Sequence, residues 1–385
     1  MTRSANPRPA QLRDVLGAPS WRLATDAVEA FVTRDGGHLG PVTFETAHGP
    51  VQPFAIAPWA GERLAAGTPG VLKSLRGDFF CLPFGGNNTP WRGETHPVHG
   101  ATASRPWRRG ALQAADGIVE FSAEMRVTER PGRVLKRIRL RVGETNVYCQ
   151  HELHGFEGPM SVGHHAMLAF PEKGGEGRIS LSPWQLGRVL PLPFENPAQG
   201  GYSALKIGAA FRDLQRVPLA AGGITDLTRY PAREGFEDLV MVSARRPSQL
   251  AWTTVTFPKA GYLWFGLKDP RTLASTVFWH SNGGRHYPPW NGRHRRVLGL
   301  EEVTSYFHLG LAESAADNTV SSRGIPTVLQ LRRAHPLAIR YVMGVAAIPP
   351  RFDVVRKVHV AADHLRFEAA SGAIVEHKLD RGFFS

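Results

Sequence analysis

Short runs in which apolar and polar residues alternate recur along most of the chain. Residues 28–45 comprise one such run, a DGG turn and a second run, which together predict a β-hairpin. Similar runs, separated by turn residues, occupy 118–129, 133–142, 146–155, 250–257, 261–269, 275–280, 302–310, 338–342 and 354–361. A period of two residues places side chains on alternate faces of a sheet, so these runs predict antiparallel strands.

Helical periodicity is scarce, and the helical candidates are parts of 9–16 and 311–316. The 41 glycines and 30 prolines are dispersed, so they act as turns between many short elements. These observations predict an all-β fold, a large antiparallel β-sandwich. Because no fixed-period repeat and no Ser/Gly linker divides the chain, we expect a single domain over 25–380, preceded by an N-terminal extension, 1–24.

Composition is that of a globular protein. With 385 residues, 42% hydrophobic and 21% charged, the chain can bury a large core. Its cysteines, Cys81 and Cys149, lie in apolar segments without zinc or redox spacing, which predicts small buried side chains. The first residues lack an apolar run of signal-peptide length, and no later segment approaches the length of a membrane span. We therefore expect a cytoplasmic protein without a membrane partner.

The formal net charge of +13 raises the question of nucleic acid. The basic residues are scattered, and the densest runs, 105–109 and 293–296, are short and belong to no nucleic-acid motif. We therefore expect no nucleic-acid partner. A positive field still favours anionic small ligands through long-range attraction.

Three separated motifs carry the candidate chemistry. They are HPVHGATASRPW at 96–107, GHHAML at 163–168 and GLEEVT at 299–304. Each places a titratable side chain beside glycine or proline, where a strand is expected to end. Together they supply two imidazoles and a carboxylate, the minimum set for moving protons on and off a hydroxyl and a ring oxygen without a metal or cofactor. Each motif alone is also compatible with a packed histidine or a solvated glutamate.

The residues of these motifs and their order along the chain resemble those of the aldose 1-epimerase (galactose mutarotase) superfamily. The resemblance implies that His99 binds the sugar, that His165 is the general acid for the ring oxygen, and that Glu301 is the general base. It also implies a β-sandwich that interconverts sugar anomers with no cofactor and no metal.

The sequence departs from the family pattern at several positions. Ala166 and Leu168 replace a proline and an aromatic residue, and Glu302 stands where the family has a proline. A shift of one residue on a strand reverses the face, so Glu302 stays an alternative to Glu301 as the base. The family arginine expected near 85–88 is missing from this chain.

Candidate sugar contacts surround these motifs. Residues 275–294 place flat aromatic and hydrogen-bonding side chains just before Glu301, as a pyranose with an apolar face and polar edges requires. The predicted substrate-binding residues are Trp279, Trp290, Asn282, Arg285, Asn87, Asn88, Trp107, Asp238 and His96. The expected partner is a monosaccharide or sugar derivative. Because Arg285 and Arg105 lie in the motif-bearing segments, a sugar with an acidic substituent is a further expectation.

Other functions stay open at this point. A non-catalytic sugar-binding protein would keep the aromatic residues and the pocket. A metalloenzyme could use His96, His99, His164 and His165 with Glu301. A glycoside hydrolase or lyase would need a second acid group, for which Glu302 or Asp238 are available. The sequence leaves the identity of the sugar and the oligomeric state open.

Overall fold

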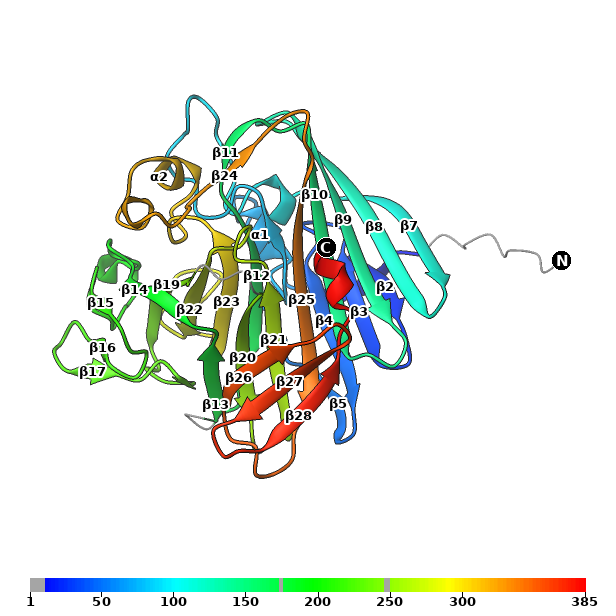
Figure 1. Ribbon diagram of the computed structural model, residues 1–385. Helices are drawn as coiled ribbons and strands as arrows, with labels where there is room; N and C mark the ends of the chain where they lie inside the picture. The colour runs from blue at the N-terminus through cyan, green and yellow to red at the C-terminus, as the bar shows by residue number, and fades with distance from the viewer. Residues whose placement is uncertain (1–10, 173–175, 246–249) are drawn as a thin grey trace.

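A computed structural model describes residues 11–172, 176–245 and 250–385. Its largest sheet is antiparallel, with nine strands in the order β18-β13-β20-β21-β25-β10-β9-β8-β7 (Figure 1). The bounds of its strands are β18 Arg229–Tyr230, β13 Gly177–Leu181, β20 Ala251–Phe257, β21 Tyr262–Lys268, β25 Leu337–Ala347, β10 Asn146–His154, β9 Gly132–Arg141, β8 Ile118–Val127 and β7 Arg108–Ala115.

A second antiparallel sheet has seven strands in the order β15-β14-β19-β22-β23-β12-β6. Its strands are β15 Ala210–Phe211, β14 Trp184–Val189, β19 Phe236–Ala244, β22 Ser275–Asn282, β23 Val297–Thr304, β12 Val162–Ala169 and β6 Phe80–Cys81. Every residue of β22 and β23 is buried, as expected for central strands covered on both faces.

Smaller elements complete the chain. A five-stranded sheet is formed by β1 Arg13–Val15, β2 Ala18–Ala24, β3 Val28–Thr33, β4 Leu39–Thr46 and β5 Gly49–Val51. A three-stranded sheet is formed by β26 Val355–Val360, β27 His364–Ala369 and β28 Ile374–Lys378. The two-stranded sheets pair β11 Gly158–Met160 with β24 Leu329–Leu331, and β16 Val217–Pro218 with β17 Ile224–Thr225. The α-helices are α1 Gly70–Lys73 and α2 Leu311–Ala315, and 3₁₀ turns cover Ala101–Ala103, Pro197–Gln199, Ser321–Arg323 and Arg381–Phe384.

The two large sheets pack face to face across one apolar cluster. Leu298 and Leu300 of β23 contribute to it from the seven-stranded sheet, and Ile339 and Met343 of β25 contribute from the nine-stranded sheet. The alternate residues of β23, Val297 and Val303 among them, belong to a different cluster on the outer face of the seven-stranded sheet. The period-two alternation of each strand therefore separates the sandwich interior from a second, outward face.

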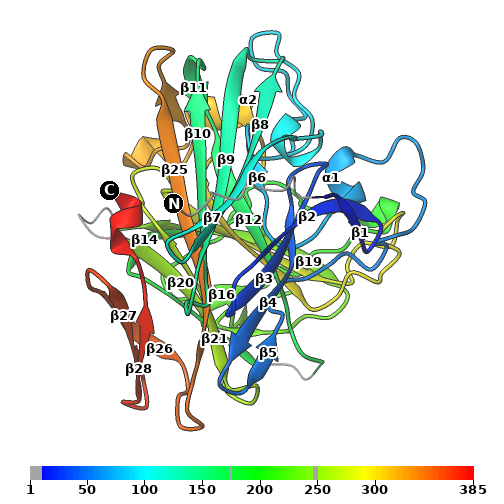
Figure 2. The ribbon, with the colours of Figure 1, turned by 90° about the vertical axis from the view of Figure 1, so that its right-hand side faces the viewer.

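The C-terminal sheet covers the outer face of the nine-stranded sheet. Phe367 of β27 packs against Phe265 of β21, with ring centroids 5.3 Å apart. Figure 2 shows this sheet and the N-terminal five-stranded sheet on opposite sides of the molecule. The large nine-stranded sheet is thus buried on both faces over its central strands.

The structure confirms the predicted β-sandwich. The hairpin expected over 28–45 is formed by β3 and β4, and the expected helix at 311–316 by α2. The helical prediction for 9–16 is wrong for 13–15, which form β1, and residues 9 and 10 lie outside the described residues. The predicted boundary at residue 24 falls between β2 and β3, which pair in one sheet, and the division into domains stays a prediction.

Both cysteines are buried free thiols, as the apolar segments predict. Among the described residues, no helix is long and apolar enough to cross a membrane.

A buried ion pair lies in the sandwich interior. Lys268 of β21 contacts the carboxylate of Glu302, which also accepts hydrogen bonds from Thr253 and Thr276 at 2.7 Å each. Both charged side chains are almost fully buried. Removing one member of such a pair leaves the other charge in a medium of low polarity without compensation.

We expect Glu302→Gln to lower the free energy of unfolding by about 3 kcal/mol, because Lys268 loses its counter-charge. Urea denaturation measures this loss. The double variant Lys268→Met/Glu302→Gln removes both charges and should recover part of it. Equal stability of Glu302→Gln and wild type would contradict the prediction.

Candidate functional site

A cavity of about 380 Å³ opens on the outward face of the seven-stranded sheet. Its volume falls within the range of small-molecule pockets. The residues around it come from β12, β19, β22 and β23, from the loops after β14, β22 and β23, and from segments 69–79 and 86–99. They are Pro69, Val71, Leu72, Leu75, Phe79, Gly86, Asn88, Val98, His99, His165, Phe194, Leu239, Trp279, Arg285, Tyr287, Trp290, Glu301 and His308.

His165 and Glu301 face each other across neighbouring strands. The register of β12 and β23 pairs these two residues directly, so their side chains leave the same face of the sheet. Nε2 of His165 lies 3.1 Å from Oε1 of Glu301. Gly299, two residues earlier on the same face, makes room for the carboxylate, because a Cβ there would lie 2.8 Å from Oε1 of Glu301.

The adjacent residues His164 and Glu302 point into the sandwich interior. Nδ1 of His164 lies 2.8 Å from Oδ2 of Asp78, and Glu302 pairs with Lys268. The sequence left Glu301 and Glu302 as alternatives, and the register places only Glu301 on the cavity. Within the described residues no group of three or more His, Cys, Asp or Glu side chains could hold a metal ion.

His99 reaches the same cavity from a loop. Its ring centroid lies 5.0 Å from that of His165, in an edge-to-face arrangement. Phe79 stacks on His165 at 4.4 Å and supports both rings. The loop needs Gly100, because a Cβ at this position, with φ of 78°, would lie 1.9 Å from the carbonyl oxygen of Leu82. The glycine that follows His99 therefore lets the backbone pass close to Leu82, and this places the imidazole of His99 at the cavity.

Burial controls the protonation of these groups. It raises the pKa of Glu301 well above its usual range and lowers the pKa of His165 to about 3. Burial also lowers the pKa of His99 well below its usual range. These shifts keep His165 and His99 neutral at pH 7 and favour the protonated form of Glu301. A buried pair of this kind titrates as a unit.

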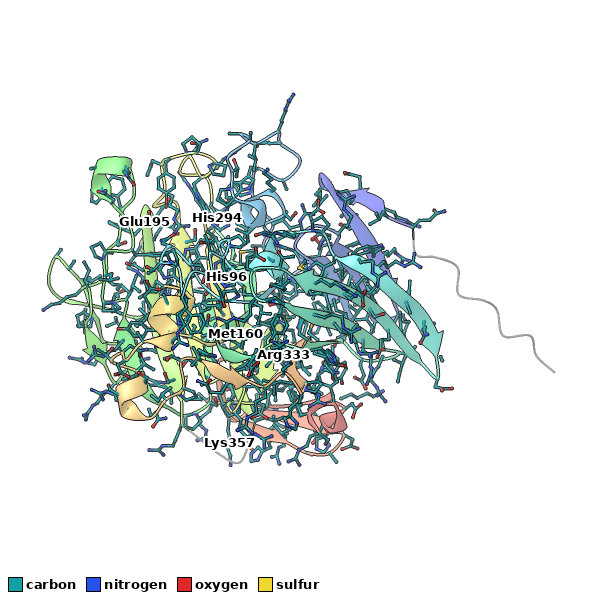
Figure 3. All side chains as sticks on the ribbon, turned by 90° about the horizontal axis from the view of Figure 1, so that it is seen from above. His96, Met160, Glu195, His294, Arg333 and Lys357 are labelled. Atoms are coloured by element: carbon teal, nitrogen blue, oxygen red, sulfur yellow. The ribbon has the colours of Figure 1, made fainter. Side chains whose placement is uncertain are left out.

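An aromatic and cationic group forms another part of the wall. The guanidinium carbon of Arg285 lies 4.6 Å from the ring centre of Trp290 and 5.4 Å from that of Trp279. Its Nε donates to Glu195 at 2.6 Å, and the hydroxyl of Tyr287 donates to the other oxygen of Glu195. The charge of Arg285 is thus already compensated by a buried carboxylate. Seen from above, Glu195 and His294 lie toward the opposite edge of the view from Lys357 of the C-terminal sheet (Figure 3).

A polar network fixes Trp279 from behind. Glu237 accepts hydrogen bonds from Nε1 of Trp279 and from the hydroxyl of Ser281, both at 2.9 Å. The Ser281 hydroxyl also lies 2.6 Å from Nδ1 of His294, whose ring stacks on Trp279 at 5.3 Å. Burial raises the pKa of Glu237 to about 7. The network holds the indole plane perpendicular to that of Trp290.

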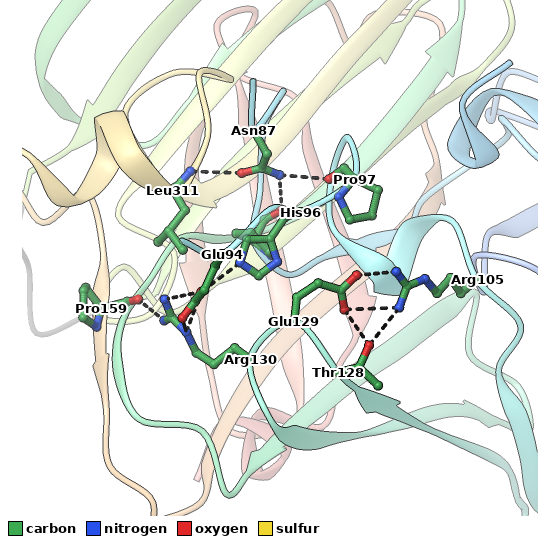
Figure 4. A network of polar contacts seen from close by, with 11 residues as sticks. Asn87, Glu94, His96, Pro97, Arg105, Thr128, Glu129, Arg130, Pro159 and Leu311 are labelled. Carbon is green, nitrogen blue, oxygen red and sulfur yellow. Dashed lines mark hydrogen bonds and ion pairs between the residues drawn. The ribbon is translucent and has the colours of Figure 1, made fainter. Parts of the chain in front are cut away.

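Asn87 and His96, which the sequence predicts as substrate-binding, instead support the loops (Figure 4). The side chain of Asn87 donates to the carbonyl oxygen of Pro97 at 3.0 Å and accepts from the backbone N–H of Leu311 at 3.0 Å. His96 contacts Glu94 at 2.9 Å, and Glu94 is held by Arg130. Neither residue lines the cavity, whereas Asn88 does.

Three other predicted contacts also lie away from the cavity. Trp107 packs in the sandwich core and donates to the carbonyl oxygen of Thr102. Asp238 pairs with Arg233 on the interior face of β19, and Asn282 bonds to backbone atoms of Ala232 and Arg296. Arg105, expected to favour acidic sugars, pairs with Glu129 with nearly half of its side chain exposed. These polar side chains satisfy neighbouring protein groups, which sequence spacing alone does not reveal.

The sequence interpretation missed several lining residues. His308 follows β23 and lines the cavity, and burial lowers its pKa to about 4. Phe194 lies in the loop after β14, in a segment that carries none of the three sequence motifs. Pro69, Val71, Leu72, Leu75 and Val98 form a surface that we call the aliphatic wall. The one available signal was the position of His308 seven residues after Glu301, within the predicted strand 302–310.

Solved structures of similar shape identify the fold. A candidate aldose 1-epimerase from Escherichia coli K12 aligns with a TM-score of 0.56 at 13% identity, covering 86% of this chain and all of that one. A galactose mutarotase-like protein from Clostridium acetobutylicum aligns with a TM-score of 0.56 at 11% identity, covering 88% of this chain and 98% of that one. The chain has the galactose mutarotase-like fold.

A galactose mutarotase related enzyme from Lactobacillus acidophilus has the same fold, with a TM-score of 0.54 at 11% identity over 85% of this chain and 97% of that one. No protein-family model matches the sequence, and no curated protein matches it. The sequence identity to these structures is therefore too low to indicate a function by itself. Any functional argument has to come from the motifs and the site.

We expect Glu301→Gln to be more stable than wild type at pH 8 and equally stable at pH 4. Because the folded-state pKa of Glu301 is raised, wild type loses stability as pH increases above the ordinary glutamate value of about 4.3. The glutamine has no proton to lose. Urea denaturation at both pH values measures the difference.

Glu124→Gln is the matched control, since Arg108 holds the pKa of this partly exposed carboxyl below its usual range. This control should gain nothing at pH 8. Lower stability of Glu301→Gln than wild type at pH 8 would mean that the carboxyl is ionised in the folded protein.

Proposed function

We propose that this protein interconverts the anomers of an aldose, as an aldose 1-epimerase does. The observation that carries the proposal is the direct pairing of Glu301 with His165, at 3.1 Å, inside a cavity walled by Trp279 and Trp290. Ring opening requires removal of a proton from one oxygen and delivery of a proton to a neighbouring oxygen. A carboxyl and an imidazole that share one proton can do both.

In the proposed mechanism the proton of Glu301 first passes to His165 across the 3.1 Å contact. The Glu301 carboxylate then accepts the proton of the C1 hydroxyl while the His165 imidazolium delivers its proton to the ring oxygen. The bond between C1 and the ring oxygen breaks, and the aldehyde forms. Rotation about the C1–C2 bond and reclosure, with the proton transfers reversed, give the other anomer. The pair starts and ends with one proton, so no net charge is created in the buried site. His99, held neutral by burial, is suited to donate to a sugar oxygen.

The charge balance of the cavity favours a neutral sugar. Among the described residues that line the cavity, Arg285 is the one Lys or Arg. Glu195 already forms an ion pair with it. The preference for an acidic sugar stays an alternative prediction, because the Nη atoms of Arg285 have no hydrogen-bond partner among the described residues. Comparing turnover of matched neutral and acidic sugars at low and high salt distinguishes the two.

We expect Glu301→Gln to lower the rate of anomerisation by about 10²- to 10⁴-fold, because it removes the base. Proton NMR of freshly dissolved α-anomers measures the rate. Glu302→Gln, assayed at a temperature where it is folded, should keep at least about a tenth of the rate, since that side chain faces the interior. Equal losses in both variants, or loss only at Glu302, would contradict the assignment.

Gly299→Ala should impair catalysis while preserving the fold. The added methyl group would lie 2.8 Å from Oε1 of Glu301 and 3.1 Å from Cβ of Trp279, so it displaces the carboxylate and presses on the indole. We expect a loss of about tenfold or more in kcat in protein that is still folded at the assay temperature, because small misplacements of reacting groups are costly. Unchanged kcat would show that the carboxylate position is not critical.

A further inference from the structure

The aliphatic wall offers no hydrogen-bonding side chain to a ligand. Helix α1 and its flanking residues supply most of it, and Val98 joins it beside the His99 loop. Its backbone carbonyls are also occupied. The carbonyl of Leu72 accepts from Nε1 of Trp59 at 2.8 Å, and that of Leu75 accepts from the N–H of Ala57 at 3.0 Å.

Most polar groups of the cavity come from other segments, although His99 directly follows Val98 of the wall and Asn88 lies earlier in the same loop. Glu301 and His165 lie on strands, and Arg285 and His308 lie in the loops that follow β22 and β23. A sugar with C1 at Glu301 therefore has hydrogen-bonding partners on part of its edge and only hydrocarbon on the part that meets the aliphatic wall. Hydroxyl groups placed there would lose water without gaining a partner.

The structure assigns this cavity to a deoxy aldose: a sugar in which hydrogen or a short alkyl group replaces a hydroxyl on the edge facing the aliphatic wall. This inference rests on the proposed anomerisation and specifies its substrate class. The cavity volume of about 380 Å³ is at the small end for ligand pockets, which suits one sugar ring rather than an oligosaccharide. A 6-deoxyhexose is the simplest member of the class, because its C6 is a methyl group that lies outside the ring and takes no part in the reaction.

Matched pairs of sugars test the inference. D-fucose against D-galactose, L-rhamnose against L-mannose and 6-deoxy-D-glucose against D-glucose each differ by one hydroxyl. For at least one pair we expect kcat/KM to be about tenfold to a hundredfold larger for the deoxy sugar, the range that an apolar pocket achieves against an added hydroxyl. Equal or larger values for the hydroxylated sugar in every pair would overturn the inference while leaving anomerisation intact.

Binding provides a readout that does not depend on turnover. Thermal shift of Glu301→Gln with each sugar compares affinities without catalysis. A larger shift with the deoxy sugar supports the inference even if no pair is anomerised, in which case the proposed activity fails by itself. Equal shifts for both members of every pair would overturn the inference.

Variants of the wall connect the preference to its residues. Val71→Thr keeps the shape of the side chain and adds a hydroxyl, so it should reduce the deoxy preference severalfold, and Leu72→Asn offers a second polar replacement should the first fail to fold. Val142→Thr is the matched control on the surface, where the side chain is 56% exposed, and it should leave the preference unchanged. An unchanged preference in both folded wall variants would contradict the assignment.

Discussion

The register between β12 and β23 is the constraint on which the site depends. It sets His165 opposite Glu301 on one face and His164 opposite Glu302 on the other. A slip of β23 by one residue would break both pairs, placing Glu302 opposite His165 on the cavity face and Glu301 in the sandwich interior. Hydrophobic alternation fixes this register, because Leu298 and Leu300 must face the core between the sheets. The chemistry is therefore positioned by residues that take no part in it.

Desolvation gives the two faces of the same strands different electrostatic characters. In the interior, Glu302 is surrounded by a lysine and two threonine hydroxyls, which compensate a buried negative charge. On the cavity face, Glu301 has an imidazole neighbour, and burial outweighs the attraction of Arg285, so the protonated form of Glu301 is favoured. Identical side chains, adjacent in sequence, thus have different surroundings, with a paired lysine beside Glu302 and an imidazole beside Glu301.

The β-sandwich, and the placement of Glu301, His165 and His99 around one cavity, were predictable because short segments of sequence carry both signals. Strand alternation is local, and Glu301, His165 and His99 each lie in a motif with a glycine that fits the backbone. Contacts across the fold were not predictable in this way. Asn87, His96, Asp238 and Trp107 have the side chains that bind sugars, but each contacts another protein group instead. Leu311, the partner of Asn87, is distant in sequence, whereas Glu94, the partner of His96, is two residues away. The aliphatic wall contains only common core residues, so no sequence signal distinguishes it. Residues 13–15, expected to be helical, form a strand because β2 pairs with them.

Asn87 joins two loops that are more than two hundred residues apart in the sequence. Its side chain holds Pro97 and Leu311, and its backbone N–H donates to the carbonyl oxygen of Leu309. The segments bearing His99 and His308 are thereby fastened to a single asparagine and form one mechanical unit. A ligand that displaced either histidine would have to move both segments against these bonds. Two sides of the cavity are consequently preorganised, and a sugar that fits them is bound without the entropic cost of ordering either loop.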